Sequence, residues 1–249
     1  MPAASDGDQV VKPALNSEVK FYQGDAGKTY RYTVVEQGTA SNGYTYDTAQ
    51  RTVTITVEGD AAHGTLKATT VVSGGPDGDK TFVYESGKTA SQAAVVPFVN
   101  RYTASGEVGI AATKSLSGRS LADGEFSFAL KYANGDEDVA TATNDANGKV
   151  DFGTLKYTTE SLAKLVKDGH AAKTVKDSKP AWNVYYEAYE KTGSGSLPGG
   201  VTAQTQPIQF TVTVVDDGDG TLTATANTGN GLEFKNAYST GDPIEVGLS

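Results

Sequence analysis

The stretch VYYEAYE at residues 184–190 decides the fold, because a similar stretch, YRYTVVE at residues 30–36, occurs earlier in the chain. In both stretches large residues alternate along the chain and a Glu closes the run. Alternation with a period of two is typical of a β-strand that buries one face. The sequence therefore predicts one kind of strand that occurs twice and ends each time in an acidic side chain.

Further motifs recur around these stretches in the same order. They are VTITV at 53–57 and TVTVV at 211–215, Gly-Thr-Leu at 64–66 and 220–222, and FVNRY at 98–102 and FKNAY at 234–238. Glu36 lies 28 residues before Gly64, and Glu190 lies 30 residues before Gly220. Such self-similarity predicts an internal repeat. We place the first copy at residues 1–104 and the second copy at residues 105–249.

The two copies are not equally complete. The second has a front section, 107–149, with strand-like runs at 110–114 and 125–130, and the first has no counterpart of these runs. We therefore expect the first copy to be truncated at its N-terminus and the chain to be a window from a longer array. The first copy also holds about 20 extra residues at 73–94, which we interpret as a loop or an added hairpin.

Strand signals dominate both copies. Val, Thr and Tyr are frequent, and turn sequences such as Asn147-Gly148 separate the alternating runs. One helix is predicted at Glu160–Asp168, with Thr159 as its cap and Gly169 at its end. The expected fold is all-β, with two tandem Ig-like β-sandwich domains and one short helix in the second.

Composition excludes several classes of protein. The 249 residues carry a net charge of −9 without a basic patch, which argues against binding to nucleic acid. The longest apolar run, near 93–99, is far too short to insert into a membrane. The absence of Cys fits a reduced cytosolic protein or a Gram-positive surface protein that avoids disulfides.

Catalytic and metal-binding motifs find little support. His63 and His170 fall at non-equivalent places in the two copies, and we expect both to be exposed loop residues. The run 216–220 is similar to a calcium loop but lacks its remaining ligands, so a hairpin turn is the better interpretation. No pair of acids can be assigned to a glycosidase cleft. We therefore expect no enzyme, no cofactor and no metal.

Three polar residues of the second copy form a sharper constellation. Lys114 lies on its first strand, Glu190 on a middle strand and Asn236 on its last strand, each among apolar or aromatic neighbours. A single Lys, Glu or Asn near a strand end is usually solvated or part of a turn. Their joint occurrence within the repeat favours a common role instead.

This order, with the YxYxVxE-like and FxNxY motifs, resembles the streptococcal pilin-type isopeptide-linkage domain. The resemblance covers 107–238 and the rear of the family pattern in 19–102. It implies a pilus shaft or adhesin stalk in the extracellular cell wall of a Gram-positive bacterium. It also implies that the side chains of Lys114 and Asn236 join spontaneously, promoted by Glu190.

The chemistry of buried side chains supports this interpretation. A Lys amine attacks only when it is neutral, and burial in apolar surroundings favours that form. A buried carboxyl is favoured in its protonated form, so it could polarise the Asn carbonyl and shuttle protons. Glu125 is a rival acid, eleven residues after Lys114. We favour Glu190 because its equivalent, Glu36, recurs in the first copy.

The first copy departs from this pattern. Glu36 and Asn100 match, but Lys12 is the only upstream lysine on a strand-like run, and it aligns better with the end of a later strand. We expect no bond in the first copy within a single chain. Its groove is expected to accept a strand from another molecule or from nearby residues.

Two functions follow as hypotheses. The first is a structural stalk or shaft module whose partners are neighbouring domains of the same long chain. The second is a binding module, in which a loop or the 73–94 insertion recognises a host glycan or protein.

Overall fold

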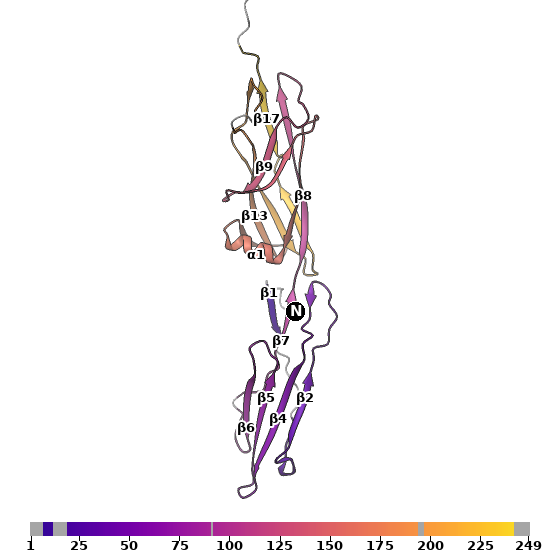
Figure 1. The fold of residues 1–249 in the computed structure, drawn as a ribbon, viewed down its shortest axis with the longest axis vertical. Coiled ribbons are helices and arrows are strands. Elements are labelled where there is room, and N and C mark those ends of the chain that lie inside the picture. The colour runs from indigo at the N-terminus through magenta and orange to yellow at the C-terminus, as the bar shows by residue number, and fades with distance from the viewer. Residues whose placement is uncertain (1–6, 12–18, 91, 194–196, 242–249) are drawn as a thin grey trace, which may run out of the picture. The chain divides into compact units, whose positions relative to one another are not determined.

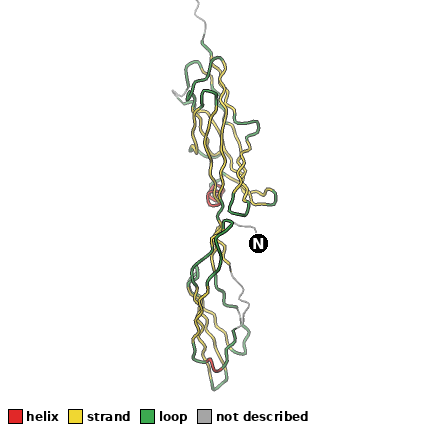
Figure 2. The backbone as a smooth tube through the Cα atoms, turned by 90° about the vertical axis from the view of Figure 1, so that its right-hand side faces the viewer, coloured by secondary structure: helices red, strands yellow, loops and turns green. Residues whose placement is uncertain are grey.

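The computed structural model describes residues 7–11, 19–90, 92–193 and 197–241, and the fold is built almost entirely of strands (Figures 1 and 2). The chain divides into two compact units with their boundary between Tyr102 and Thr103. Strand β7 ends at Tyr102, strand β8 begins at Ser105, and the two belong to different sheets. We describe the two units separately as the first and second copy.

The first copy consists of two sheets, ordered β1-β7-β3 and β2-β4-β5-β6. Its elements are β1 (Gly7–Val11), η1 (Gln23–Asp25), β2 (Thr29–Val34), β3 (Tyr44–Thr45), β4 (Arg51–Asp60), β5 (Thr65–Ser73), β6 (Lys80–Glu85) and β7 (Phe98–Tyr102). The alternation predicted from VTITV holds, because Val53, Ile55 and Val57 of β4 point into the core. The extra residues of this copy form β6, which pairs with β5 and adds a strand to the sheet.

The second copy is a fuller sandwich. One sheet has the order β10-β9-β13-β15-β16, with β12 also paired to β13, and the other has the order β11-β8-β17-β14. Its elements are β8 (Ser105–Ser117), β9 (Ser127–Tyr132), β10 (Asp138–Thr143), β11 (Lys149–Thr158), α1 (Thr159–Lys167), β12 (Ala171–Lys176), β13 (Lys179–Glu190), β14 (Val201–Thr202), β15 (Ile208–Asp216), β16 (Leu222–Asn227) and β17 (Glu233–Tyr238). An all-β fold of two tandem sandwich domains is thus what the sequence predicted.

The helix lies one residue earlier than predicted. The Thr158 side chain, not that of Thr159, accepts a hydrogen bond from the Ser161 backbone N–H, and the Ser161 hydroxyl accepts one from the Thr158 N–H. Thr158 still has extended backbone angles, which is why it can cap the helix while Thr159 begins it. Leu162 and Leu165 are the buried face.

Strand β8 runs in the middle of its sheet, between β11 and β17. It pairs antiparallel with β11 and parallel with β17. The Asn147-Gly148 turn passes close to it, since the Gly148 carbonyl accepts a hydrogen bond from the Lys114 N–H at 2.6 Å. A Cβ at Gly148 would lie 2.1 Å from the Lys114 carbonyl oxygen, so only glycine fits there. This turn fixes the backbone of Lys114.

The two copies fill the corresponding sheet position differently. In the second copy β8 lies beside the last strand, β17, in parallel; in the first copy β1 lies beside the last strand, β7, in antiparallel orientation. The predicted groove of the first copy is therefore lined along this edge by a strand of the same chain.

We expect the first copy to unfold at a lower temperature than the second. Most of the buried apolar residues of the described chain lie after Thr103, and buried apolar area is the main source of stability. Calorimetry should show two transitions, with the lower one assigned by proteolysis to residues before Thr103. A single cooperative transition would contradict this.

Candidate functional site

The three polar residues singled out in the second copy all point into its core. In β8, Ile110, Ala112 and Lys114 alternate inward, and in β17 Phe234 and Asn236 do the same. In the parallel register Phe234 lies opposite Lys114 and Asn236 lies opposite Leu116, so Lys114 and Asn236 lie on neighbouring strands. The alternation that builds the core thus also buries Lys114 and Asn236.

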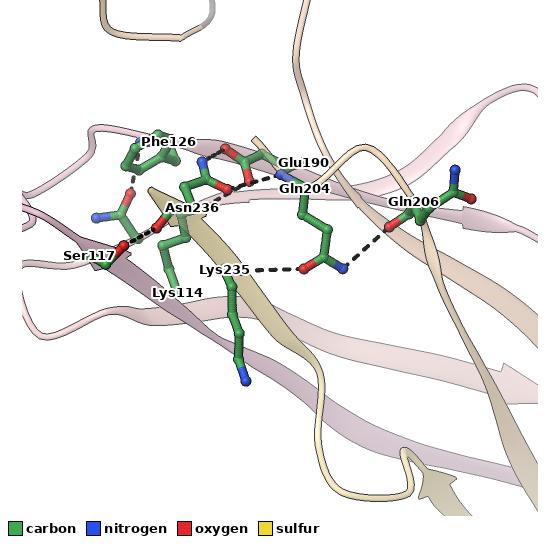
Figure 3. Close-up of polar contacts among 9 residues, drawn as sticks. Lys114, Ser117, Phe126, Glu190, Gln204, Gln206, Lys235 and Asn236 are labelled. Atoms are coloured by element: carbon green, nitrogen blue, oxygen red, sulfur yellow. Dashed lines mark hydrogen bonds and ion pairs between the residues drawn. The ribbon is translucent and has the colours of Figure 1, made fainter. Parts of the chain in front are cut away.

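Glu190 reaches the same place from the other sheet. It is the last residue of β13, whose inward face also carries Tyr186 and Ala188. Its Oε2 accepts a hydrogen bond from Lys114 Nζ at 2.8 Å, and its Oε1 accepts one from Asn236 Nδ2 at 2.7 Å (Figure 3). The carboxyl group therefore bridges the amine and the amide.

The amine lies in apolar surroundings. The side chains of Lys114 and Glu190 are both 0% exposed. Lys114 Nζ lies 4.4 Å from the centre of the Phe126 ring and 5.7 Å from that of Phe128. Burial lowers the pKa of Lys114 from its ordinary value, and the hydrogen bond and charge of Glu190 oppose that shift. The net lowering favours the neutral, nucleophilic amine.

Glu125, the rival acid, is engaged elsewhere. Both of its carboxyl oxygens contact the Arg119 guanidinium, and one also accepts a hydrogen bond from the Ala122 N–H at 2.9 Å. The Arg119 hydrogen bond is the main cause that holds the pKa of Glu125 below its usual value. Glu125 influences Lys114 through its charge, but the hydrogen bonds of its carboxyl go to Arg119 and Ala122.

The first copy repeats part of this arrangement. Asn100 Nδ2, on β7, donates to Glu36 Oε1 at 2.8 Å, as Asn236 does to Glu190. Glu36 Oε2, which corresponds to the oxygen that Lys114 contacts, is buried and has no hydrogen-bond partner among the described residues. Lys12, the upstream candidate, lies outside the described residues.

One contact of the site carries no signal in the sequence. The backbone N–H of Gln204, in the loop after β14, donates to Asn236 Oδ1 at 3.2 Å. A backbone donor depends on the path of the loop and not on the identity of a side chain, so residue patterns do not reveal it.

The other residues weighed in the sequence lie apart from this cluster. His63 is exposed and pairs with Asp60, as expected. The expectation for His170 is wrong: it is half-buried and stacks on Tyr132, with ring centroids 4.6 Å apart. The run at 216–220 forms the predicted hairpin turn between β15 and β16. In the described parts of the chain no three acidic or His side chains gather as metal ligands would, and no helix is long and apolar enough to cross a membrane.

Comparison with known proteins identifies the family of the chain. Residues 4–103 and 110–239 each match FctA, described as the Spy0128-like isopeptide containing domain. No curated protein matches the chain. The two matches together cover most of the chain and follow the two copies of the repeat. The chain therefore belongs to the FctA family of Spy0128-like isopeptide containing domains, and it carries two of them in tandem.

Proposed function

We propose that the chain is a structural stalk or shaft module of a Gram-positive cell-surface adhesin or pilus, stabilised by a spontaneous isopeptide bond between Lys114 and Asn236. The single observation that carries this proposal is the buried bridge of Glu190 between Lys114 Nζ and Asn236 Nδ2. FctA domains are pilin-type structural domains, not enzymes. The partners of this module are neighbouring domains of the same long chain.

The bond forms in one balanced condensation. Lys114 transfers a proton to Glu190, and the neutral amine attacks Asn236 Cγ. Glu190 returns that proton to Nδ2 as the bond from Cγ to Nδ2 breaks, and one ammonia leaves. Glu190 then takes the second proton that the attacking nitrogen gives up, so the new amide and the acid are both neutral. Transfer of the proton within the Lys114–Glu190 pair also removes two charges from an apolar core. The fold holds the two side chains together. This proximity supplies the effective concentration that an enzyme would otherwise provide.

The intact mass of the purified chain tests this proposal. We expect a mass below that of the sequence by one ammonia, not two, because no Lys contacts the Glu36–Asn100 pair within the described first copy. Proteolysis should yield a branched peptide that joins β8 to β17.

Matched variants identify the acid. Lys114→Ala and Glu190→Ala should restore the full sequence mass, whereas Glu125→Ala should still lose one ammonia, since its carboxyl is committed to Arg119. Wild-type protein at full sequence mass would remove the bond from the proposal. Loss of the bond in Glu125→Ala alone would assign the role to the other carboxylate.

A further inference from the structure

We propose that the backbone N–H of Gln204 is the oxyanion donor for the Lys114–Asn236 reaction and that the Gln204 side chain holds this donor in place. The inference rests on the proposed isopeptide bond and assigns it a group that lies on the oxygen where negative charge develops. The N–H points at Asn236 Oδ1 from 3.2 Å (Figure 3).

The hydrogen bonds fix which way the Asn236 amide faces. A backbone N–H can only donate, so the atom facing Gln204 must be the carbonyl oxygen. Asn236 Nδ2 then faces Glu190 Oε1, at 2.7 Å. Rotating the amide by half a turn would set two donors against each other at Gln204.

This orientation gives Glu190 and the Gln204 N–H different roles in the reaction. Because Glu190 faces the nitrogen, it is placed to protonate Nδ2 as it departs as ammonia and not to polarise the carbonyl oxygen. Attack by Lys114 on Cγ pushes negative charge onto Oδ1, and Gln204 N–H is the donor aimed there. A preformed donor at a developing oxyanion, in a site closed to water, is a large source of rate.

The same donor occurs at the matching position of the first copy. Asp47 N–H donates to Asn100 Oδ1 at 3.0 Å. Asp47 follows β3 by two residues and Gln204 follows β14 by two residues. Each of these short strands pairs antiparallel with the strand that carries the Asn. The contact therefore belongs to the repeat and not to one loop.

The side chain of the donor residue braces it in both copies. Gln204 Oε1 accepts a hydrogen bond from the Lys235 N–H at 3.3 Å, and Asp47 Oδ2 accepts one from the Val99 N–H at 3.0 Å. Lys235 and Val99 each directly precede the Asn. The Gln and Asp side chains have only one feature in common here, an oxygen that accepts this hydrogen bond. We infer that the position requires an acceptor that ties the loop to the strand carrying the Asn.

Three substitutions separate the donor from its brace. Gln204→Pro removes the N–H, Gln204→Ala keeps the N–H but removes the brace, and Gln204→Asp installs the residue of the first copy. The full chain is made by cell-free synthesis, aliquots are stopped in acid, and the fraction that has lost one ammonia is followed by intact mass. Folding of each variant is measured by Trp182 fluorescence in a Lys114→Met background, where no bond can form.

We expect Gln204→Pro to form the bond about 10²-fold more slowly than wild type. Gln204→Ala should be slowed several-fold at every pH, because a backbone N–H does not titrate, and Gln204→Asp should recover most of the rate. If Gln204→Pro fails to fold, the proposal is tested by the slower bond formation in Gln204→Ala and the recovered rate in Gln204→Asp.

Two different failures can be told apart. A wild-type chain that never loses ammonia removes the isopeptide proposal and this inference with it. A wild-type chain that reacts, together with folded Gln204→Pro and Gln204→Ala chains that react equally fast, removes only the oxyanion donor.

Discussion

Replacing Glu190 with Gln is expected to lower the unfolding midpoint of the second copy by roughly 15 °C or more. The bond between Lys114 and Asn236 would close a loop of about 120 residues, which on the chain-entropy model is worth about 5 kcal/mol of unfolding free energy. For a domain of this size each kcal/mol moves the midpoint by about 3 °C. Calorimetry of the wild-type and Glu190→Gln chains measures the difference.

Asn236→Ala is the reference for this comparison, because it loses the bond but keeps the Lys114–Glu190 pair. Glu190→Gln should be the less stable of the two, since it leaves the buried amine without its acid. Equal midpoints in Glu190→Gln and wild type would show that no bond depends on Glu190. A shift confined to the transition of the first copy would also contradict the expectation.

The dependence on pH should separate the same two variants. Burial lowers the pKa of Lys114 from 10.5, and Glu190→Gln removes the main contact that opposes this shift. The unfolded chain then holds a proton that the folded domain gives up, so stability should rise with pH between the lowered folded pKa and 10.5. The slope is at most about 1.4 kcal/mol per pH unit. A Lys114→Met/Glu190→Gln chain should lack this rise.

The periodicity of the strands explains why the candidate site could be read from the sequence. Lys114 and Asn236 stand at inward positions of alternating strands, where an apolar residue would be expected, and the repeat supplies Glu36 and Asn100 for comparison. A polar residue that breaks an apolar alternation in two copies is visible without coordinates. The strand-rich fold could be predicted for the same reason.

Features that depend on direction and loop path could not be predicted. Residues 19–21 resemble 150–152, but in the first copy they form no strand, and Phe21 packs on Tyr30 instead. The sequence of β1, GDQVV, is equally compatible with parallel and antiparallel pairing, so it does not reveal that β1 runs opposite to β7. The role of the Gln204 N–H does not depend on residue identity, so the sequence does not predict it. The one-residue shift of α1 came from two adjacent Thr residues that cap equally well.

Force should reveal the largest effect of the bond. Strands β8 and β17 are parallel neighbours, so tension applied at the two ends of the second copy loads them in opposite directions along their length (Figure 1). With Lys114 joined to Asn236, the load passes from one strand directly to the other, and the residues between them carry none of it. The covalent path therefore shields most of the second copy from extension.

Single-molecule pulling from the two termini is expected to extend the wild-type second copy by roughly 400 Å less than that of Lys114→Ala. This is the length of about 120 residues at the contour length of an extended chain. Unfolding of the first copy is the internal reference, because its described residues hold no Lys against the Glu36–Asn100 pair and it should lengthen equally in both chains. Glu125→Ala should behave like wild type. A wild-type trace in which the second copy gives its full unfolded length would show that the load runs through the hydrogen-bonded strands alone, and the shaft role would then rest on noncovalent shear resistance between β8 and β17.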